Sequence, residues 1–261
     1  MVPESSSDVT RQMNVIGIGA GSASFVTASA AEAIAATDVF VVIDKGSEKA
    51  DLVGLRREIL DRFAGSRPFR LVVVEDGQRD DRLAYAEAVA RWHAARVEEF
   101  ERVLTNEVAN GEVSGILVWG DPSLYDSTLR IIDQVNDRGR VFVEYTVHPG
   151  ISSVQVLTAR HRIGLNRIGG SVLITTGRRL RDGLPDGVDD VVVMLDAETS
   201  FTTLVGHGFE IFWGAYLGSP DEVLISGPLD VVADEIVRVR AAARAAKGWM
   251  FDTYLLRRLS S

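Results

Sequence analysis

Short apolar runs alternate with segments of helical periodicity through the first half of the chain. The runs are followed by glycine, proline or polar residues and cover residues 13–17, 39–43, 71–74, 116–119 and 141–147. Continuous apolar runs are typical of strands that are covered on both faces of a sheet. Apolar side chains at spacings of three and four predict helices at residues 22–36, 51–63, 82–109 and 127–136. Strands that alternate with helices predict a mainly parallel five-stranded α/β sheet.

The second half of the chain has a different pattern. Strands are expected at residues 171–176, 190–195, 210–217, 222–226 and 249–256, and helices at 198–205 and 229–246. The turn-rich sequence Gly218-Ser219-Pro220-Asp221 joins two of these strands and predicts a hairpin. We therefore expect a flexible tail at residues 1–12, an N-terminal α/β domain at 13–148 and a C-terminal mixed α/β domain at 149–261.

Composition narrows the classes of function. The chain has 261 residues, 46% of them hydrophobic, and a formal net charge of -9. An acidic balance argues against a nucleic-acid partner, because phosphate contacts need clustered Lys and Arg, although a local basic pocket stays possible. The polar N-terminus has no apolar core of a signal peptide, and no apolar run is long enough to span a bilayer. We expect a cytoplasmic protein without a membrane partner.

The inventory of reactive side chains is small. The chain has no cysteine, which excludes disulfides, thiolate nucleophiles and iron–sulfur clusters. Its four histidines are not spaced like a metal pair on a helix, so no metal site is predicted. Nearly all basic residues are arginines, which fits either codon bias or bidentate recognition of carboxylates.

A glycine loop follows the first predicted strand and reads Gly17-Ile18-Gly19-Ala20-Gly21-Ser22. Glycines let a backbone approach a ligand closely, and ligands of open parallel sheets bind at the carboxyl ends of the strands. The loop resembles a dinucleotide-binding fingerprint, with Asp44 after the second strand placed to hold a ribose. Ser22 stands where that fingerprint has its third glycine, so NAD or FAD binding is one alternative among others.

Two further motifs follow predicted strands. Trp119-Gly120-Asp121-Pro122-Ser123-Leu124-Tyr125 comes after the fourth strand, and His148-Pro149-Gly150-Ile151-Ser152-Ser153 comes after the fifth. The first is also consistent with a plain Asp-Pro turn, and the second with a turn between domains whose serines cap the next helix. Neither motif identifies a function by itself.

Together, the glycine loop, G-D-P-x-x-Y and P-G-I-S-S resemble the tetrapyrrole methylase family, over residues 13–258. Within that family, several strings resemble the deacetylating branch, which converts precorrin-5 to precorrin-6A. These strings lie at residues 44–46, 119–130, 175–180, 192–196, 213–218 and 248–257. The glycine loop lacks the Pro and Asp of the usual family sequence G-x-G-P-G-D, and in this it too resembles the deacetylating branch.

The resemblance implies two α/β domains with S-adenosylmethionine in the cleft between them. It implies methylation of C1 of precorrin-5, release of the C20 acetyl group as acetate, and a homodimer. Methyl transfer from an activated sulfonium needs positioning rather than a metal or a covalent intermediate. Deacetylation needs an activated water molecule, and therefore one general base.

The resemblance also implies which residues contact the cofactor, largely through backbone atoms. These are Gly19, Ala20, Gly21, Gly120, Asp121, Tyr125, Ser152, Ser153, Met194, Leu195, Ala215, Tyr216 and Pro228.

Candidates for the chemistry are fewer, and each has a structural alternative. Asp44 lies at a strand end and is the first candidate for a catalytic carboxylate, with a helix or turn cap as its structural alternative. Tyr125 could orient the substrate or be a buried packing residue. His148 could serve as the base or hold the fold. Arg178 and Arg179 could bind the acetate and propionate groups of precorrin-5 or lie in solvent.

Other functions remain open from the sequence alone. The chain could be a tetrapyrrole methylase with another target carbon or a non-corrinoid substrate, or a relative that methylates ribosomal RNA, against which the net charge argues. An NAD-dependent oxidoreductase and a non-catalytic binding module are the remaining alternatives. The G-D-P-x-x-Y turn argues against the first, and several unusual strand-end loops argue against the second.

Overall fold

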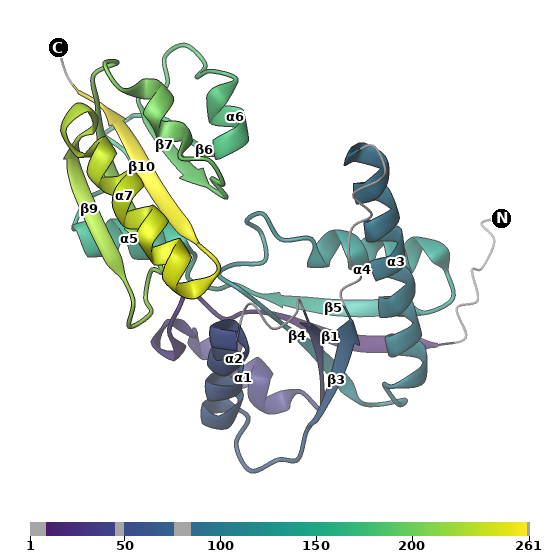
Figure 1. Cartoon of the computed structure of the whole chain (residues 1–261). Helices are drawn as coiled ribbons and strands as arrows, with labels where there is room; N and C mark the ends of the chain where they lie inside the picture. Colours follow the sequence, from purple (N-terminus) through teal and green to yellow (C-terminus); the bar gives the residue numbers. More distant parts are fainter. Residues whose placement is uncertain (1–8, 45–49, 76–84, 260–261) are drawn as a thin grey trace. The chain divides into compact units, whose positions relative to one another are not determined.

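The computed structural model describes residues 9–44, 50–75 and 85–259 of the chain (Figure 1). It divides into two compact units. Unit 1 comprises Met1–Gly19 and Ala23–Ile151, and unit 2 comprises Ala20–Ser22 and Ser152–Ser261. Each unit is built around one five-stranded sheet.

The sheet of unit 1 is parallel throughout, as the sequence predicts. Its strands are β1 (Thr10–Gly17), β2 (Val39–Asp44), β3 (Arg70–Glu75), β4 (Val113–Val118) and β5 (Phe142–His148), in the order β3-β2-β4-β1-β5. The carboxyl ends of β4, β1 and β5 are therefore neighbours, which brings the three motif loops to one edge of the sheet. A dinucleotide-binding fold has its first strand beside its second, whereas here β4 lies between them.

Helices cover both faces of this sheet. They are α1 (Ala28–Ala36), α2 (Ala50–Phe63), α3 (Tyr85–Asn106) and α4 (Thr128–Arg138). Ile34 of α1 and Ile59 of α2 are buried in one apolar cluster, and Val103 of α3 and Ile132 of α4 are buried in another. The helix expected from residue 22 begins later, because the Thr27 side chain accepts a hydrogen bond from the Ala30 amide and caps α1. A short 3-10 helix, η1 (Ala23–Phe25), precedes it.

Strand β1 begins at Thr10, so residues 10–12, expected in the tail, belong to the sheet. Gln12 pairs with Val113 on one side and with Glu144 on the other. Arg11 is buried, and its guanidinium donates to the carbonyl of Leu104 at 2.9 Å and to Asn110 Oδ1 at 2.6 Å. Because these partners lie far along the chain, local hydrophobic periodicity does not reveal where the strand begins.

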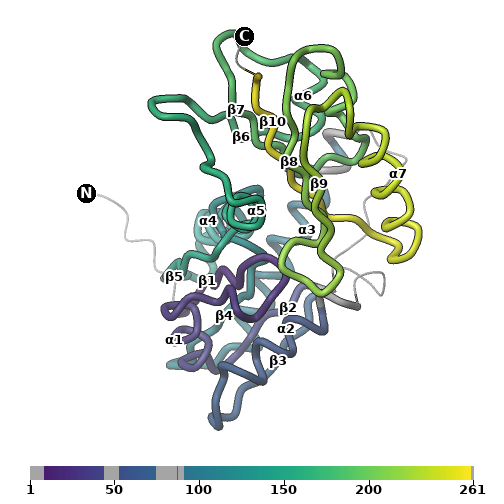
Figure 2. Tube along the Cα trace, turned by 90° about the vertical axis from the view of Figure 1, so that its left-hand side faces the viewer, coloured from purple at the N-terminus to yellow at the C-terminus, as the bar shows by residue number. Residues whose placement is uncertain are grey.

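Unit 2 has a mixed sheet, which confirms the second part of the predicted fold. Its strands are β6 (Val172–Thr176), β7 (Asp190–Met194), β8 (Phe209–Ala215), β9 (Val223–Pro228) and β10 (Asp252–Arg258). The order is β6-β7-β10-β8-β9, with β6 and β7 parallel and the other pairs antiparallel. Figure 2 follows the path of the chain through these strands. The hairpin of β8 and β9 forms around residues 218–221 as predicted.

The remaining elements of unit 2 differ in part from the expectation. They are α5 (Ser153–His161), α6 (Gly177–Arg181), the 3-10 helix η3 (Ser200–Leu204) and α7 (Leu229–Lys247). The prediction gave no range for α5, missed α6, placed a longer helix at η3, and began the last strand three residues before Asp252. In α5, Ser152 and Gln155 form a reciprocal capping box, which agrees with the expectation that the serines after Pro149-Gly150 cap the next helix.

Candidate functional site

The loops after β1 and β4 are joined backbone to backbone in unit 1. The Gly19 amide donates to the Gly120 carbonyl at 3.2 Å, and the Gly120 amide donates to the Gly19 carbonyl at 2.9 Å. Both glycines have positive φ angles, of 78° and 69°, which other residues adopt only with strain. The two motifs that the sequence places after separate strands therefore form one structure.

The loop after β5 packs against the same place without room for side chains. A Cβ atom on Gly150 would lie 2.0 Å from the Gly120 carbonyl oxygen, and one on Gly17 would lie 2.5 Å from the Gly150 amide nitrogen. Real Cβ contacts do not come this close, so the three loops approach as closely as bare backbone allows. Gly150, which the expected site did not include, is thus part of its framework.

The Asp121 carboxylate organises these loops. Its Oδ2 accepts a hydrogen bond from the Gly150 amide at 2.9 Å, and its Oδ1 accepts from the Ser123 amide at 2.9 Å and from the Ser123 hydroxyl. Partial burial raises the pKa of this carboxyl, but these hydrogen bonds outweigh burial and hold the pKa below its ordinary value. Asp121 is therefore ionised at neutral pH, with both oxygens engaged within unit 1.

Tyr125 presents its side chain at the end of the same loop. Its φ angle of 52° is unusual for a residue with a large side chain, and 44% of its surface is exposed. Partial burial raises the pKa of its phenol above the ordinary value, so the group is a neutral hydrogen-bond donor at neutral pH. That state suits orientation of a substrate better than removal of a proton.

The other two candidates for the chemistry lie at strand ends. His148 Nδ1 is 2.8 Å from the Ser29 hydroxyl and Nε2 is 3.2 Å from Asn14 Oδ1, so both ring nitrogens have partners within unit 1. Burial lowers the pKa of His148, which keeps the imidazole neutral. Asp44 is the last residue of β2, and its side chain lies outside the described part of the structure.

In unit 2, the expected cofactor residues gather around the start of β10. Met194, the last residue of β7, pairs with Thr253, and Ala215, the last residue of β8, pairs with Asp252. The Thr253 hydroxyl donates to the Ser153 hydroxyl at 2.8 Å. Strands that are separate in sequence thus place these residues side by side.

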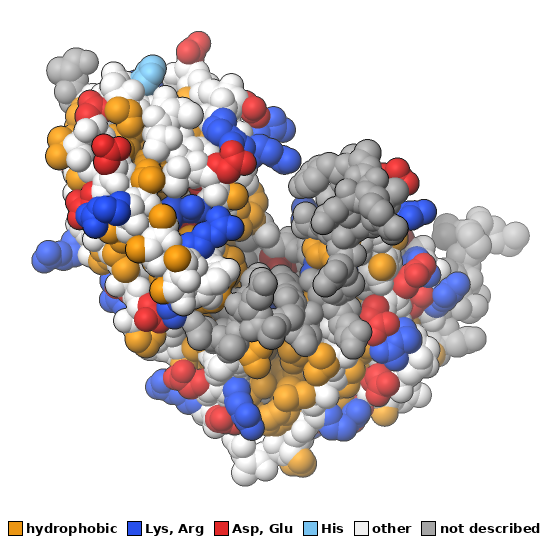
Figure 3. All heavy atoms as spheres, in the orientation of Figure 1, with side chains coloured by type: hydrophobic (Ala, Val, Ile, Leu, Met, Phe, Trp, Pro, Cys, Tyr) orange, Lys and Arg blue, Asp and Glu red, His pale blue; other side chains and the backbone are white. Residues whose placement is uncertain are grey.

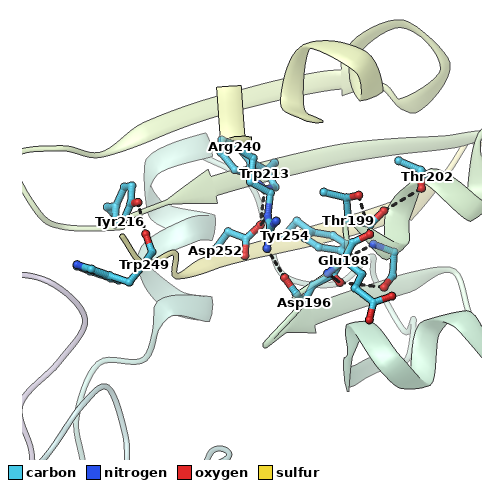
Figure 4. Close-up of polar contacts among 11 residues, drawn as sticks. Asp196, Glu198, Thr199, Thr202, Trp213, Tyr216, Arg240, Trp249, Asp252 and Tyr254 are labelled. Carbon is cyan, nitrogen blue, oxygen red and sulfur yellow. Dashed lines mark hydrogen bonds and ion pairs between the residues drawn. The ribbon is translucent and has the colours of Figure 1, made fainter. Parts of the chain in front are cut away.

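The residues directly after β7 and β8 have left-handed backbones. Leu195 has a φ angle of 53° and is 56% exposed, and Tyr216 has a φ angle of 48° and is buried. The Tyr216 hydroxyl donates to the Trp249 carbonyl at 2.7 Å (Figure 4), so this side chain is used within unit 2. Strained backbone of this kind persists only where its surroundings enforce it, and it often marks a binding site.

Asp196 enforces the conformation after β7. Its Oδ2 accepts from the Tyr254 hydroxyl at 2.7 Å and from the Ser200 amide at 2.6 Å, and its Oδ1 accepts from the Ser200 hydroxyl at 2.8 Å. The Asp196 carbonyl accepts from the Arg240 guanidinium (Figure 4). Asp196 and Tyr254 are both buried, and burial with the adjacent carboxylate raises the pKa of Tyr254 well above its ordinary value.

A second buried carboxylate lies beside the first. Asp252 Oδ2 accepts from Arg240 Nε at 2.9 Å and from Trp213 Nε1 at 3.0 Å. Arg240 therefore links Asp252 at the start of β10 to the carbonyl of Asp196 after β7. The expected site did not name these residues, because their partners lie on four separate elements and leave no local pattern.

The remaining expected residues have varied surroundings. Ser152 caps α5, Pro228 ends β9, and Ala20 and Gly21 belong to unit 2, where a Cβ on Gly21 would lie 2.1 Å from the Leu217 carbonyl oxygen. Arg178 and Arg179 are exposed on α6, over which basic side chains gather in Figure 3. Arg179 forms an ion pair with Asp182, in which Nη1 of the arginine lies 3.6 Å from Oδ2 of the aspartate.

This arrangement of loops matches a known family. A model of the tetrapyrrole (corrin/porphyrin) methylases matches residues 12–233, which include all three motif loops and the ends of β7, β8 and β9. The chain belongs to the tetrapyrrole methylase family. This assignment agrees with the family resemblance of the sequence and removes the support for a dinucleotide-dependent oxidoreductase.

Among curated tetrapyrrole methylases, the chain is 43% identical over 249 residues to "Precorrin-6A synthase [deacetylating]" from Sinorhizobium sp., covering 95% of each. Among solved structures, a putative cobalamin-synthesis-related protein (CobF) from Corynebacterium diphtheriae has a TM-score of 0.83 at 36% identity, covering 97% of this chain and all of that one. Cobalt precorrin-4 methyltransferase has a TM-score of 0.62 at 14% identity, covering 99% and 98%, and shows the shared fold alone.

None of the helices that the structure describes in this methylase is both long and apolar enough to cross a membrane. No three His, Cys, Asp or Glu side chains within the described ranges are grouped so as to hold a metal ion.

Proposed function

We propose that the chain is an S-adenosylmethionine-dependent C-methyltransferase that methylates C1 of precorrin-5 and releases the C20 acetyl group as acetate, giving precorrin-6A. The similarity to the deacetylating synthase of Sinorhizobium along almost the whole chain carries this proposal. The similarity to CobF at 36% identity supports the same branch of the family.

The loops described above fit a cofactor that is held mainly by backbone atoms. Glycines with positive φ angles after β1 and β4, and left-handed residues after β7 and β8, expose main-chain groups at the strand ends. S-adenosylmethionine supplies an activated methyl group when bound. The proposed contacts are Gly19, Ala20, Gly21, Gly120, Asp121, Tyr125, Ser152, Ser153, Met194, Leu195, Ala215, Tyr216 and Pro228.

The side chains of several of these residues already have partners, so we assign them backbone contacts. Asp121 uses its carboxylate on the adjoining loops, Ser152 uses its hydroxyl to cap α5, and Tyr216 donates its hydroxyl to Trp249. The exposed side chain of Leu195 is instead available for apolar contact with a ligand.

The chain's own contribution to methyl transfer is positioning, because the methyl group is already activated. The neutral phenol of Tyr125 donates a hydrogen bond that orients the tetrapyrrole. Acetate release consumes one water molecule, which adds to the acetyl carbonyl before the bond to C20 breaks. Asp44 is our first candidate for the base that deprotonates this water, since both ring nitrogens of His148 are engaged.

The decisive experiment is incubation with precorrin-5 and S-adenosylmethionine labelled with tritium in its methyl group, without added metal. Mass analysis of the tetrapyrrole and an acetate assay are the readouts. We expect a gain of one methyl group with release of acetate. Methyl transfer without release of acetate would mean that another carbon is the target. Binding of the cofactor without methyl transfer would overturn the assignment of precorrin-5 as the substrate.

We also propose that the protein is a homodimer, as the family resemblance implies. Sedimentation equilibrium over a hundredfold range of protein concentration is the test. A mass of one chain across the whole range would contradict it.

A further inference from the structure

Side chains from three elements of unit 1 form a hydrogen-bond relay that ends at an exposed serine. Ser29, in the first turn of α1, has its hydroxyl 2.8 Å from His148 Nδ1, at the end of β5. His148 Nε2 lies 3.2 Å from Oδ1 of Asn14 on β1. A hydroxyl, an imidazole and a side-chain amide in this order match the parts of a nucleophilic site, in which the imidazole removes the proton of the hydroxyl.

The far end of the relay fixes the direction of each hydrogen bond. The Thr37 hydroxyl donates to the Ala33 carbonyl at 2.8 Å, so its oxygen accepts from Asn14 Nδ2 at 3.3 Å. Asn14 therefore turns its Oδ1 towards His148 and accepts from Nε2–H. In the neutral imidazole, Nδ1 then carries no proton and accepts from the Ser29 hydroxyl. This tautomer of His148 is the one that can take a proton from Ser29.

His148 is kept neutral and is held against α1. Partial burial lowers its pKa, so the imidazole is ready to accept a proton at neutral pH. The Thr27 hydroxyl, at the N-cap of α1, donates to the carbonyl of Pro149 at 3.2 Å, directly after His148. Two contacts therefore join the start of α1 to the end of β5 and keep the hydroxyl and the imidazole together.

The start of α1 also supplies donors for the negative charge that develops during nucleophilic attack. Thr27 accepts from the Ala30 amide with its side chain and from the Ala31 amide with its carbonyl. The amides of Ala28 and Ser29 have no acceptor among the residues that the structure describes. They lie at the positive end of a nine-residue helix, beside the serine hydroxyl. Backbone donors in this position stabilise an oxyanion.

We propose that Ser29, His148 and Asn14 form a second catalytic site, which hydrolyses small carboxylic esters through an acyl-serine intermediate. Because Ser29 is exposed, a small ester can reach its hydroxyl from solvent. Asn14 is a positioning residue that holds the tautomer of His148. This activity goes beyond methyl transfer and is separate from release of the C20 acetyl group.

The reaction has two balanced halves. Ser29 Oγ attacks the carbonyl carbon while His148 Nδ1 takes its proton, and the tetrahedral intermediate then expels the alcohol, which receives that proton. Water next attacks the acyl-serine and gives a proton to His148. The carboxylic acid leaves as Ser29 Oγ recovers its proton from the imidazole.

The first test uses p-nitrophenyl acetate as the ester and a fluorophosphonate probe that labels activated serines. We expect the wild type to hydrolyse the ester and to be labelled at Ser29, as located by mass spectrometry of peptides. Hydrolysis is expected to fall about a hundredfold in Ser29→Ala and in His148→Gln. Ser66→Ala and His207→Gln are the matched controls, because both residues are exposed and take no part in the relay, and they should behave as the wild type.

A thiol reporter tests the base directly, since the chain has no cysteine. In a Ser29→Cys variant the thiol lies beside His148, which favours the reactive thiolate. Alkylation by iodoacetamide at neutral pH is expected to be about tenfold faster than in the exposed control Ser66→Cys. Adding His148→Gln to Ser29→Cys should lower the rate to that of the control.

Asn14→Asp distinguishes positioning from a structural role. The new carboxylate still accepts from Nε2–H, and its negative charge raises the pKa of His148. We expect the midpoint of the pH profile of ester hydrolysis to move to higher pH, a change that a merely structural role would not produce. An unchanged midpoint would overturn the role of Asn14.

Equal hydrolysis by the wild type and Ser29→Ala would overturn the second site, and so would labelling of Ser29 that persists unchanged in His148→Gln. Equal alkylation of Ser29→Cys and Ser66→Cys would show that His148 does not act as a base. Urea denaturation establishes that each variant is folded. Because these assays use neither precorrin-5 nor S-adenosylmethionine, their failure would leave the proposed methyltransferase standing, and failure of the methyltransferase would leave this site standing.

Discussion

The Asp121 carboxylate accepts a hydrogen bond from the Gly150 amide at 2.9 Å, and this contact joins the loop after β4 to the loop after β5. Asp121→Asn replaces one carboxylate oxygen by an NH2 group, which cannot accept a hydrogen bond. Whichever way the amide is oriented, the variant therefore loses the hydrogen bond from the Gly150 amide or the one from the Ser123 amide. We expect the free energy of unfolding to fall by about 2 kcal/mol. We also expect the Kd for S-adenosylmethionine to rise. Urea denaturation and calorimetric titration are the measurements, and an unchanged free energy of unfolding would contradict the role of this contact.

The stabilisation from Asp121 has a defined pH dependence. Its folded pKa lies below the ordinary value, so the unfolded chain binds the proton more readily than the folded one. The contribution is complete above the ordinary aspartate pKa of about 4 and is lost as pH falls through the lowered folded pKa. The stability difference between wild type and Asp121→Asn should therefore be constant near neutrality and shrink below that pH. A difference that grows under acid would show the opposite sign of the shift.

Gly150→Ala tests the close approach of the three loops. The new Cβ would lie 2.0 Å from the Gly120 carbonyl oxygen, so backbone must move. We expect a loss of about 3 kcal/mol or more in the free energy of unfolding. Gly54→Ala in α2 is the matched control, because nothing lies within 4 Å of its Cβ, and it should raise stability by about 0.5–1 kcal/mol. Equal effects of the two substitutions would be inconsistent with the packing described.

The contact between Asp196 and Tyr254 can be measured by a double-mutant cycle. Tyr254→Phe removes the hydroxyl at 2.7 Å, while the Ser200 amide still donates to the same carboxylate oxygen. We expect a loss of about 1–2 kcal/mol for Tyr254→Phe, more for Asp196→Asn, and a coupling energy of about 1 kcal/mol. Because Asp196 holds the turn after Leu195, the Kd for S-adenosylmethionine should rise with both variants. Strictly additive losses would mean that the two side chains act independently.

His148→Gln separates a structural role from a catalytic one. Glutamine can partner Ser29 and Asn14 in part but cannot act as a base, so a structural role predicts kcat within about threefold of the wild type. Burial lowers the folded pKa of His148, so its contribution to stability is present above the unfolded pKa of about 6.5 and is lost as pH falls through the folded value. A hundredfold loss of acetate release in a folded variant would identify His148 as the base instead.

The parallel sheet could be predicted from the sequence because its strands read as short apolar runs that alternate with helical segments. Burial on both faces holds for the central strand β4, whereas Leu71 and Val73 of β3 and Phe142 and Val147 of β5 are exposed. The order of the strands in unit 2 could not, since β10 pairs with β7 and β8 across long separations in the chain. The five residues of α6 are too few to show a helical period. Strand ends were therefore easier to predict than the pairing that brings them together.

The sequence marks the candidate site only through glycines and strand ends. It places Gly19 and Gly120 in loops at the same edge of the sheet, but their pairing and the roles of Gly150 and Asp196 depend on contacts that only the fold creates.

Strand β10 occupies the middle of its sheet although it follows β6 to β9 in the sequence, and this position bears on how unit 2 folds. During synthesis on the ribosome, β7, β8 and β9 emerge before β10, and β7 and β8 pair with β10 rather than with each other. Asp252 and Tyr254, which anchor the turn after β7, emerge together with β10. The sheet of unit 2 therefore cannot close until β10 has left the ribosome, and a stop codon before Asp252 would leave the unit without its central strand.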